Sequence, residues 1–171
     1  MELASLVRDV PDFPVQGILF KDITTLIKHA DAFHQVVDWM ADQHADSQVD
    51  QVVAVEARGY IFGAPLAYKL GAGFVPVRKP GKLPAKVISE SYELEYGTNV
   101  LEVHADAIQP GQRVVVVDDL LATGGSAQAT INLVERLGGE VISIVFMIEL
   151  DFLHGRDKLE GYNVVSMIHY S

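Results

Sequence analysis

A short segment of the chain carries residue types that suit a sugar phosphate. Four valines are followed by two adjacent carboxylates, Asp118 and Asp119, and then by a loop that contains Thr123, two glycines and Ser126. Backbone N–H groups in such a loop, together with the partial positive charge of a helix N-terminus, can hold a phosphate without a lysine. Adjacent carboxylates cannot serve that same phosphate, so they suit hydroxyls, a metal ion or a developing positive charge.

This segment differs from the common nucleotide-binding loops. It lacks the lysine of a nucleotide P-loop, and the chain contains no G-x-G-x-x-G fingerprint. Gly124 and Gly125 permit a close backbone approach and positive φ angles. A plain helix N-cap at Ser126 is the alternative interpretation, but it leaves the paired acids unexplained. We therefore predict a site that binds an anion at one end and a diol at the other.

Strand and helix patterns alternate around this segment. Continuous β-branched runs, which are typical of strands buried on both faces, occupy residues 51–56, 73–77, 113–118 and 141–149, with a weaker run at 163–168. Helical spacing occupies residues 31–45, 59–70 and 125–137. The alternation predicts an α/β fold with an open, mainly parallel sheet flanked by helices, and it places ligands at the carboxyl ends of the strands.

One long segment falls outside this alternation. Between residues 80 and 111 the pattern weakens, and residues 86–103 could form a β-hairpin that turns near residues 95–98. A segment of this kind is often a lid or an active-site loop.

A basic cluster precedes the hairpin. Four of the thirteen Lys and Arg residues lie within nine positions, namely Arg78, Lys79, Lys82 and Lys86, although the whole chain has a net charge of −10. A local positive cluster on an acidic protein suggests a small, highly charged anion as its partner, with a solvated loop as the alternative.

Composition limits the class of protein. The 171 residues suit a single domain, and the absence of cysteine excludes disulfides, thiolate metal sites and a cysteine nucleophile. No apolar run approaches the roughly 20 residues that span a bilayer, and the first residues lack the apolar core of a signal peptide. The acidic balance argues against nucleic acid as a partner. We expect a cytoplasmic protein that binds neither nucleic acid nor membrane.

The order of several segments resembles one enzyme family. Segments similar to those of the adenine phosphoribosyltransferases, which are type I phosphoribosyltransferases, occupy residues 11–24, 56–63, 77–84, 91–97 and 110–126. Because they occur in family order with comparable spacing, the resemblance covers nearly the whole chain. It implies one domain over residues 1–171, with a small hood from about residues 1–30 and a flexible lid hairpin at about 84–103.

The resemblance implies a reaction in purine salvage. Adenine and phosphoribosyl pyrophosphate (PRPP) would give AMP and pyrophosphate in a homodimeric enzyme. Mg²⁺ would be carried by PRPP, since this ion prefers oxygen ligands from substrate and water to an all-protein cage. We expect no protein-only metal site, and the six histidines show no convincing ligand spacing.

The family pattern assigns roles around the ribose and the lid. Asp118 and Asp119 would hold the ribose hydroxyls and favour a positively charged ribosyl transition state. The 5′-phosphate would lie on the loop formed by Ala122, Thr123, Gly124, Gly125 and Ser126. In the lid, Glu95 beside Tyr96 would manage the purine proton, although a solvated hairpin charge is the alternative for Glu95.

The family also assigns the pyrophosphate and adenine contacts. Phe20 would stack on adenine, with a core aromatic as the alternative, while the backbone of Leu19 and Lys21 reads one base edge and Arg58 approaches the other. Pyrophosphate would be held by Glu56, Ala57, Arg58, Arg78, Lys79 and Lys82. The resemblance also implies that Arg78 reaches the neighbouring subunit's site. Many family members have aspartate and serine where this chain has Glu56 and Ala57, so any hydroxyl contact at position 57 is absent.

Three other functions compete with this interpretation. A phosphoribosyltransferase for xanthine or guanine is disfavoured by Ala122, because the 6-oxopurine enzymes place an aspartate there, and by the segment at residues 91–97 (SYELEYG). A non-catalytic regulator that senses PRPP would usually add a DNA-binding domain, for which the chain has no room, or a basic RNA-binding face, which its acidity opposes. A structural interaction module would leave the acids and glycines of residues 118–126 unexplained.

Overall fold

The computed structural model describes residues 2–94 and 97–171, and these residues divide into two compact units, Met1–Trp39 and Met40–Ser171. The first unit contains the 3₁₀ turn η1 (Leu3–Leu6), the strands β1 (Arg8–Pro11) and β2 (Leu19–Asp22), the short helix α1 (Thr24–Ile27) and the beginning of α2 (Ala30–Asp42). Strands β1 and β2 pair antiparallel, from Arg8 opposite Asp22 to Pro11 opposite Leu19. The sequence patterns did not predict this small sheet.

The second unit contains the predicted alternation of strands and helices. Its elements are β3 (Gln51–Val55), α3 (Arg58–Leu70), β4 (Gly73–Val77), β5 (Val87–Glu93), β6 (Thr98–His104), β7 (Arg113–Leu121), α4 (Gly125–Arg136), β8 (Glu140–Leu150), η2 (Asp151–Leu153), η3 (Gly155–Leu159) and β9 (Val164–Tyr170). Five of these strands form one parallel sheet in the order β4-β3-β7-β8-β9. The predicted open parallel α/β sheet is therefore confirmed.

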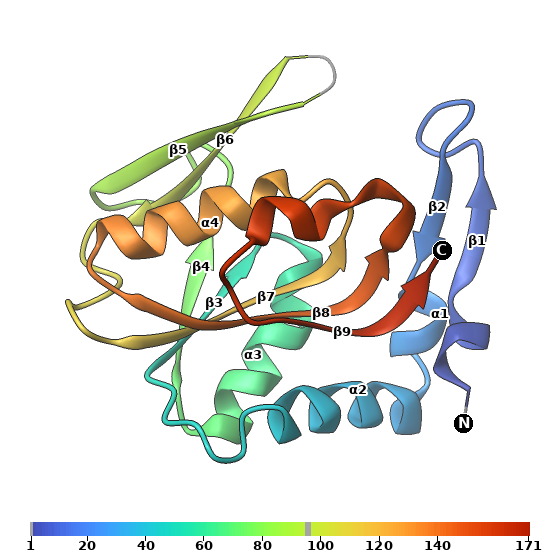
Figure 1. Ribbon diagram of the computed structural model, residues 1–171, viewed down its shortest axis with the longest axis horizontal. Helices are drawn as coiled ribbons and strands as arrows, with labels where there is room; N and C mark the ends of the chain where they lie inside the picture. The colour runs from blue at the N-terminus through green and yellow to red at the C-terminus, as the bar shows by residue number, and fades with distance from the viewer. Residues whose placement is uncertain (1, 95–96) are drawn as a thin grey trace. The chain divides into compact units, whose positions relative to one another are not determined.

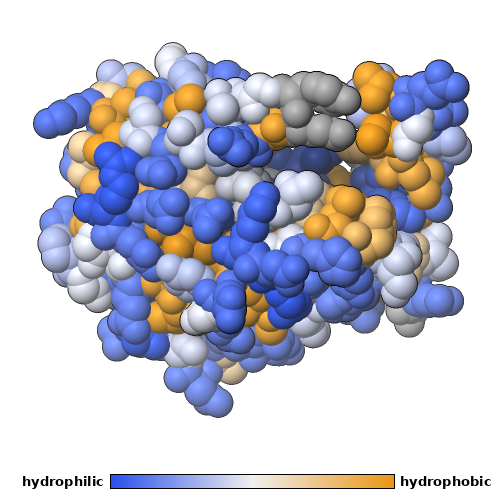
Figure 2. Space-filling view, turned by 45° about the horizontal axis from the view of Figure 1, so that its top comes forward, coloured by the Kyte–Doolittle hydropathy of each residue, from blue (hydrophilic) through white to orange (hydrophobic). Residues whose placement is uncertain are grey.

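Helices cover both faces of this sheet. Figure 1 shows α3 on one face and α4, with the β5–β6 hairpin beside it, on the other. The valines of β3 and β7 are almost completely buried, as expected for strands that are covered on both sides. On the outside, hydrophilic residues cover much of the face seen in Figure 2, with apolar patches between them. None of the described helices is long and apolar enough to cross a membrane.

Strand β7 is longer than the sequence pattern predicts. The buried run ends at Asp118, but the strand continues to Leu121 because it stays paired with β8 as far as Leu121 opposite Glu149. Its pairing with β3 ends earlier, at Val117. Asp118 and Asp119 therefore belong to the strand rather than to the loop after it.

The predicted hairpin is present, and its stem is fixed to α4. Strands β5 and β6 pair from Val87 opposite His104 to Glu93 opposite Thr98. Arg136 of α4 donates a hydrogen bond to the Ser89 carbonyl oxygen and pairs with Glu90, while two residues of β6 are buried in the core, Leu101 and Val103. The flexible lid and the hood remain predictions.

Close packing of α3 on the sheet yields a stability prediction. A Cβ atom added to Gly63 would lie 2.7 Å from the Ala54 Cβ and 3.1 Å from Cε2 of Phe74. Overpacking of this kind costs about 1–3 kcal/mol, which should exceed the roughly 1 kcal/mol that alanine gains over glycine inside a helix. We expect Gly63→Ala to lower the free energy of unfolding in urea.

The neighbouring Ala64 provides the matched control, because it is exposed. Ala64→Ser also adds one heavy atom and should change the free energy of unfolding by no more than about 0.5 kcal/mol. A Gly63→Ala variant as stable as the wild type would contradict the close approach of α3 to β3.

Candidate active site

A cavity of about 560 Å³ opens at the carboxyl edge of the parallel sheet. The turn after β3, the end of β7 and the loop before α4 line it, together with residues of the hairpin. The predicted site residues among its lining are Glu56, Ala57, Arg58, Lys79, Asp118, Asp119, Ala122, Thr123, Gly124 and Ser126. The structure thus brings together segments that the sequence analysis had to join by resemblance.

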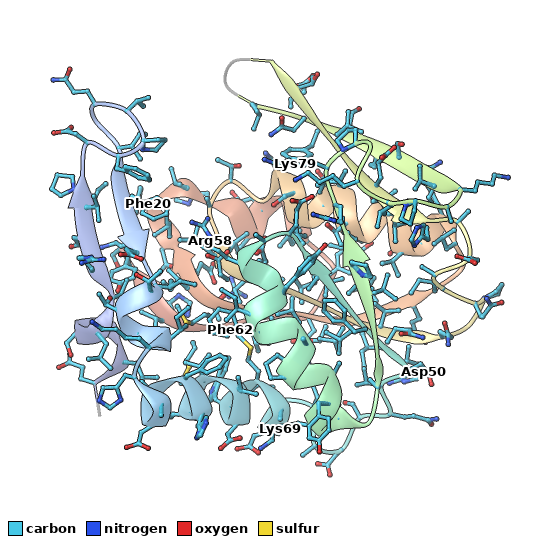
Figure 3. All side chains as sticks on the ribbon, turned by 180° about the vertical axis from the view of Figure 1, so that it is seen from behind. Phe20, Asp50, Arg58, Phe62, Lys69 and Lys79 are labelled. Atoms are coloured by element: carbon cyan, nitrogen blue, oxygen red, sulfur yellow. The ribbon has the colours of Figure 1, made fainter. Side chains whose placement is uncertain are left out.

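The two acids lie where β7 extends beyond its pairing with β3. Asp119 is buried and its Oδ2 lies 2.9 Å from Nε of Arg58, in the first turn of α3. Its backbone N–H donates to Oδ1 of Asp118, 2.8 Å away. A Cβ on Gly59 would lie 3.1 Å from that same Oδ1, so glycine at this position leaves room for the Asp118 side chain. Figure 3 shows Arg58 at the end of α3 opposite to Lys69.

The environment of Asp118 disfavours its negative charge. Burial and then the neighbouring charge of Asp119 raise the pKa of the Asp118 carboxyl well above its usual 3.8, while Arg58 acts in the opposite direction without cancelling them. The ionised form of Asp118 is therefore electrostatically unfavourable in the free protein. A ligand that brings a positive charge or hydroxyl donors would stabilise that form.

The loop before α4 has the geometry of an anion site. Gly124 has a φ of +86°, a left-handed conformation that favours glycine, and it occupies the N-cap position of α4. Within the described part of the chain, no side chain caps this helix terminus. Backbone N–H groups at such a terminus can bind a phosphate. Gly125 does not line the cavity and instead faces the ring of Tyr92, whose Cδ2 would lie 2.9 Å from an added Cβ.

The basic cluster contacts an acid within the same unit. The Glu56 carboxylate accepts a hydrogen bond from the Lys79 backbone N–H at 2.7 Å and one from Nζ of Lys82 at 2.8 Å, and it lies 3.4 Å from Nε of Arg78. Burial alone would raise the pKa of Glu56, but the contacts with Lys82, Lys79 and Arg78 together lower it. Arg78 and Lys82 do not line the cavity, whereas Lys79, labelled in Figure 3, does.

The other residues predicted to contact adenine belong to the first unit. Leu19, Phe20 and Lys21 form part of β2 in the first unit, where the Phe20 ring contacts that of Phe13 edge-on at 5.1 Å between centroids. Lys21 pairs with Asp9 in the same unit. Their role at a base stays a prediction. Glu95 and Tyr96 lie outside the described residues, so no geometry bears on their predicted roles.

Sequence reasoning missed several cavity residues. Tyr92, Leu94 and Leu101 of the hairpin region and Phe146 of β8 also line the cavity. Their apolar character resembles ordinary core packing in the sequence, so only their position in the fold reveals them. In the structure, intermediate and exposed residues alternate along β5, and Tyr92 lies on the less exposed face.

A cluster of possible metal ligands lies at the ends of β8 and β9. Glu149, Asp151 and His169 bring one ligand atom each within 4.8 Å of one another. Arg156 already binds both oxygens of Glu149, at 2.9 and 2.7 Å. This arrangement leaves little capacity for a cation, so the cluster is better explained as an ion-pair network.

The raised pKa of Asp118 predicts an effect on stability. Because the pKa of the Asp118 carboxyl is higher in the folded than in the unfolded protein, its effect on stability depends on pH. Stability is greatest below the unfolded-state pKa and is lost as pH rises from there through the folded-state pKa. Asp118→Asn removes that loss while it keeps an oxygen for the Asp119 N–H. We expect a higher melting temperature at pH 7, with a gain that shrinks as pH falls toward about 4.

Thermal unfolding across this pH range checks the effect, with the exposed Asp106→Asn as control. Asp106→Asn should leave the melting temperature nearly unchanged. A lower melting temperature for Asp118→Asn at pH 7, or a gain independent of pH, would contradict the electrostatic account.

Comparison with known proteins agrees with the fold. The family model for the phosphoribosyl transferase domain matches residues 24–170. The adenine phosphoribosyltransferase of Alkaliphilus metalliredigens is 61% identical over 170 residues, which cover 99% of this chain and 100% of that protein.

Solved structures give the same result. The adenine phosphoribosyltransferase of Thermoanaerobacter pseudethanolicus has a TM-score of 0.96 at 57% identity and covers 99% of this chain and 98% of its own. The Saccharomyces cerevisiae enzyme, in complex with an imino-altritol bisphosphate and adenine, has a TM-score of 0.91 at 40% identity, with 97% and 96% covered. The resemblance inferred from the sequence is confirmed, and the chain belongs to the adenine phosphoribosyltransferase family.

Proposed function

We propose that this protein transfers the phosphoribosyl group of PRPP to N9 of adenine, forming AMP and pyrophosphate. The single observation that carries the proposal is the cavity at the sheet edge. It places a carboxylate pair beside a helix N-terminus that has no side-chain cap. An acid pair suits the ribose, and the helix terminus suits its 5′-phosphate. Full-length similarity to adenine phosphoribosyltransferases supports adenine as the base.

The acids stabilise the positive charge that develops at the ribose. As pyrophosphate leaves C1, the ribosyl group gains oxocarbenium character, and a nearby fixed negative charge lowers the free energy of that state. Burial and the neighbouring Asp119 disfavour the ionised form of Asp118 in the free protein, and a cationic transition state would favour that form. Arg58 holds Asp119 in place through their ion pair.

The opposite end of the cavity suits the leaving group. Glu56, Ala57 and Arg58 line this end of the cavity, and Lys79 contributes positive charge there. The Glu56 carboxylate orders the basic loop through Lys79 and Lys82 rather than contacting pyrophosphate itself, since two anions repel. Mg²⁺ bound to PRPP would neutralise charge on the leaving pyrophosphate, and the carboxylate oxygens of the cavity fit the ligand preference of this ion.

The proposal also assigns residues to the adenine base and its proton. Phe20 would stack on adenine with the backbone of Leu19 and Lys21 at its edge, and Glu95 would take the purine proton. A closed lid would exclude water from the oxocarbenium-like state. The homodimer, the reach of Arg78 toward a second subunit and a cytoplasmic location rest on the resemblance alone.

A panel of bases tests the function. Purified protein is incubated with PRPP, Mg²⁺ and adenine, hypoxanthine, guanine or xanthine, and nucleotide formation is followed chromatographically. We expect AMP from adenine and at most slow reaction with the 6-oxopurines, because Ala122 cannot exchange a proton with them. Turnover of guanine or xanthine faster than adenine would reject the specificity, and PRPP binding without any turnover would favour a regulator.

The carboxylate pair gives a kinetic prediction. Asp118→Asn and Asp119→Asn should each lower turnover by more than about tenfold, equivalent to about 1.4 kcal/mol of barrier. The exposed Asp106→Asn variant should keep its turnover. Full activity in the Asp118→Asn, Asp119→Asn double variant would show that the pair does not act on the ribose.

Glu95 gives a second kinetic prediction. Glu95→Gln keeps the side-chain shape but cannot exchange a proton, so it should lower kcat and leave PRPP affinity nearly intact. The exposed Glu93→Gln is the matched control on the same hairpin and should change neither quantity. Normal kcat for Glu95→Gln would favour the alternative that Glu95 is a solvated charge on the hairpin. Loss of PRPP binding would point to a role in lid closure.

A further inference from the structure

The loop that follows β8 packs directly against the phosphate loop. A Cβ added to Gly155 would overlap the Ala122 carbonyl oxygen and lie 3.0 Å from Cδ1 of Leu121. A Cβ added to Gly124 would lie 2.5 Å from the Gly155 carbonyl oxygen. Each loop therefore presents a glycine to the other, and their backbones meet without an intervening side chain. The position of Gly155 sets the space that is available to residues 122–124.

Arg156, the next residue, is held by three hydrogen bonds. Its Nε and Nη2 donate to the two oxygens of Glu149 at 2.9 and 2.7 Å, and its Nη1 donates to the Val164 carbonyl oxygen at 2.9 Å. A bidentate arginine–carboxylate pair fixes both distance and orientation. Because Glu149 lies in β8 and Val164 begins β9, the guanidinium is anchored to two neighbouring strands of the sheet.

The anchor is well suited to hold its position. The Glu149 residue is only 5% exposed, and its hydrogen bonds from Arg156 lower the pKa of its carboxyl, although burial opposes them. The same bonds raise the pKa of the Arg156 guanidinium. Both partners therefore stay charged over the whole physiological pH range. The Asp151 carboxylate and the His169 ring also face this pair, and they contact each other at 2.9 Å.

We propose that Arg156 is a positioning residue for the 5′-phosphate site, acting through Gly155. Anchored by Glu149, it keeps the Gly155 backbone against Ala122 and Gly124, so that the N–H groups before α4 converge on one phosphate. Donors that are preorganised in this way bind more tightly than donors that must be ordered by the ligand. This inference rests on the proposed function, because it assigns the 5′-phosphate to that loop.

The opposite end of β8 supplies a matched control. Arg113 pairs with Glu140, the first residue of β8, at 3.5 Å, and it donates to the Gln48 carbonyl oxygen at 2.9 Å. Like Arg156, it therefore joins a carboxylate of β8 to a backbone carbonyl. It lies at the amino edge of the sheet, away from the cavity residues. Arg113→Gln measures the loss of an arginine that anchors β8 at a more exposed carboxylate, away from the phosphate loop.

The experiment compares Arg156→Gln, Arg156→Lys, Gly155→Ala and Arg113→Gln with the wild type. For each protein, calorimetry gives the Kd for ribose 5-phosphate, and steady-state kinetics gives kcat and the KM values for PRPP and adenine. We expect Arg156→Gln and Gly155→Ala to raise the Kd for ribose 5-phosphate and the KM for PRPP by about tenfold or more, with KM for adenine changed by less than about threefold. Arg156→Lys keeps the positive charge but loses the bidentate hydrogen bonds, so its Kd and KM values should be intermediate. Arg113→Gln should have the same values as the wild type.

The outcomes separate positioning from general stability. If folded Arg156→Gln and Gly155→Ala bind ribose 5-phosphate as the wild type does, the positioning role is wrong. A proportional loss of kcat and of affinity for both substrates would equally overturn it. If Arg156→Gln does not fold, Gly155→Ala, which keeps the ion pair, decides between a positioning role and a role in general stability. A wild-type protein that binds ribose 5-phosphate but makes no AMP would reject the proposed function and leave the positioning role measurable by binding.

Discussion

Strand β7 continues beyond its pairing with β3 while it stays paired with β8, and the arrangement of the site depends on this mismatch. It exposes an edge of β7 under the first turn of α3, where Asp118 and Asp119 meet Arg58. The same extension delivers the chain to Ala122 beside the loop after β8. A strand that ended with β3 would leave the acids in a mobile loop, where neither their spacing from α3 nor their burial would be defined.

At this edge, the residues that the proposed reaction requires are unfavourable for the stability of the fold. Two adjacent carboxylates in a partly buried site repel each other, and Arg58, which pairs with Asp119, offsets this repulsion only in part. The surrounding structure supplies the stability that this pair lacks, through buried valines in β3 and β7 and the close contact of α3. At the other end of the cavity, Glu56 orders the basic loop through its hydrogen bonds from Lys79 and Lys82.

Local patterns predicted the elements that long-range contacts then arranged. Runs of valine and isoleucine predicted the strands because burial on both faces demands apolar residues throughout, and the acids followed from their place at the end of such a run. The pairing of Glu56 with Lys82 joins residues 26 positions apart, so no local pattern could reveal it. The packing of Gly155 on Ala122 is a contact between backbones, for which the sequence shows only a glycine. The end of β7 was misplaced because β8, and not the composition of β7, determines it.

The central claim is that backbone amides before α4, rather than lysine side chains, bind the sugar phosphate. Titration of ¹⁵N-labelled protein with ribose 5-phosphate, followed by amide chemical shifts, tests it most directly. The account predicts that the largest shifts fall on residues 123–127, which include the uncapped N-terminus of α4, and that the loop at residues 78–82 changes little. Largest shifts at Lys79 and Lys82, with residues 123–127 unaffected, would contradict it.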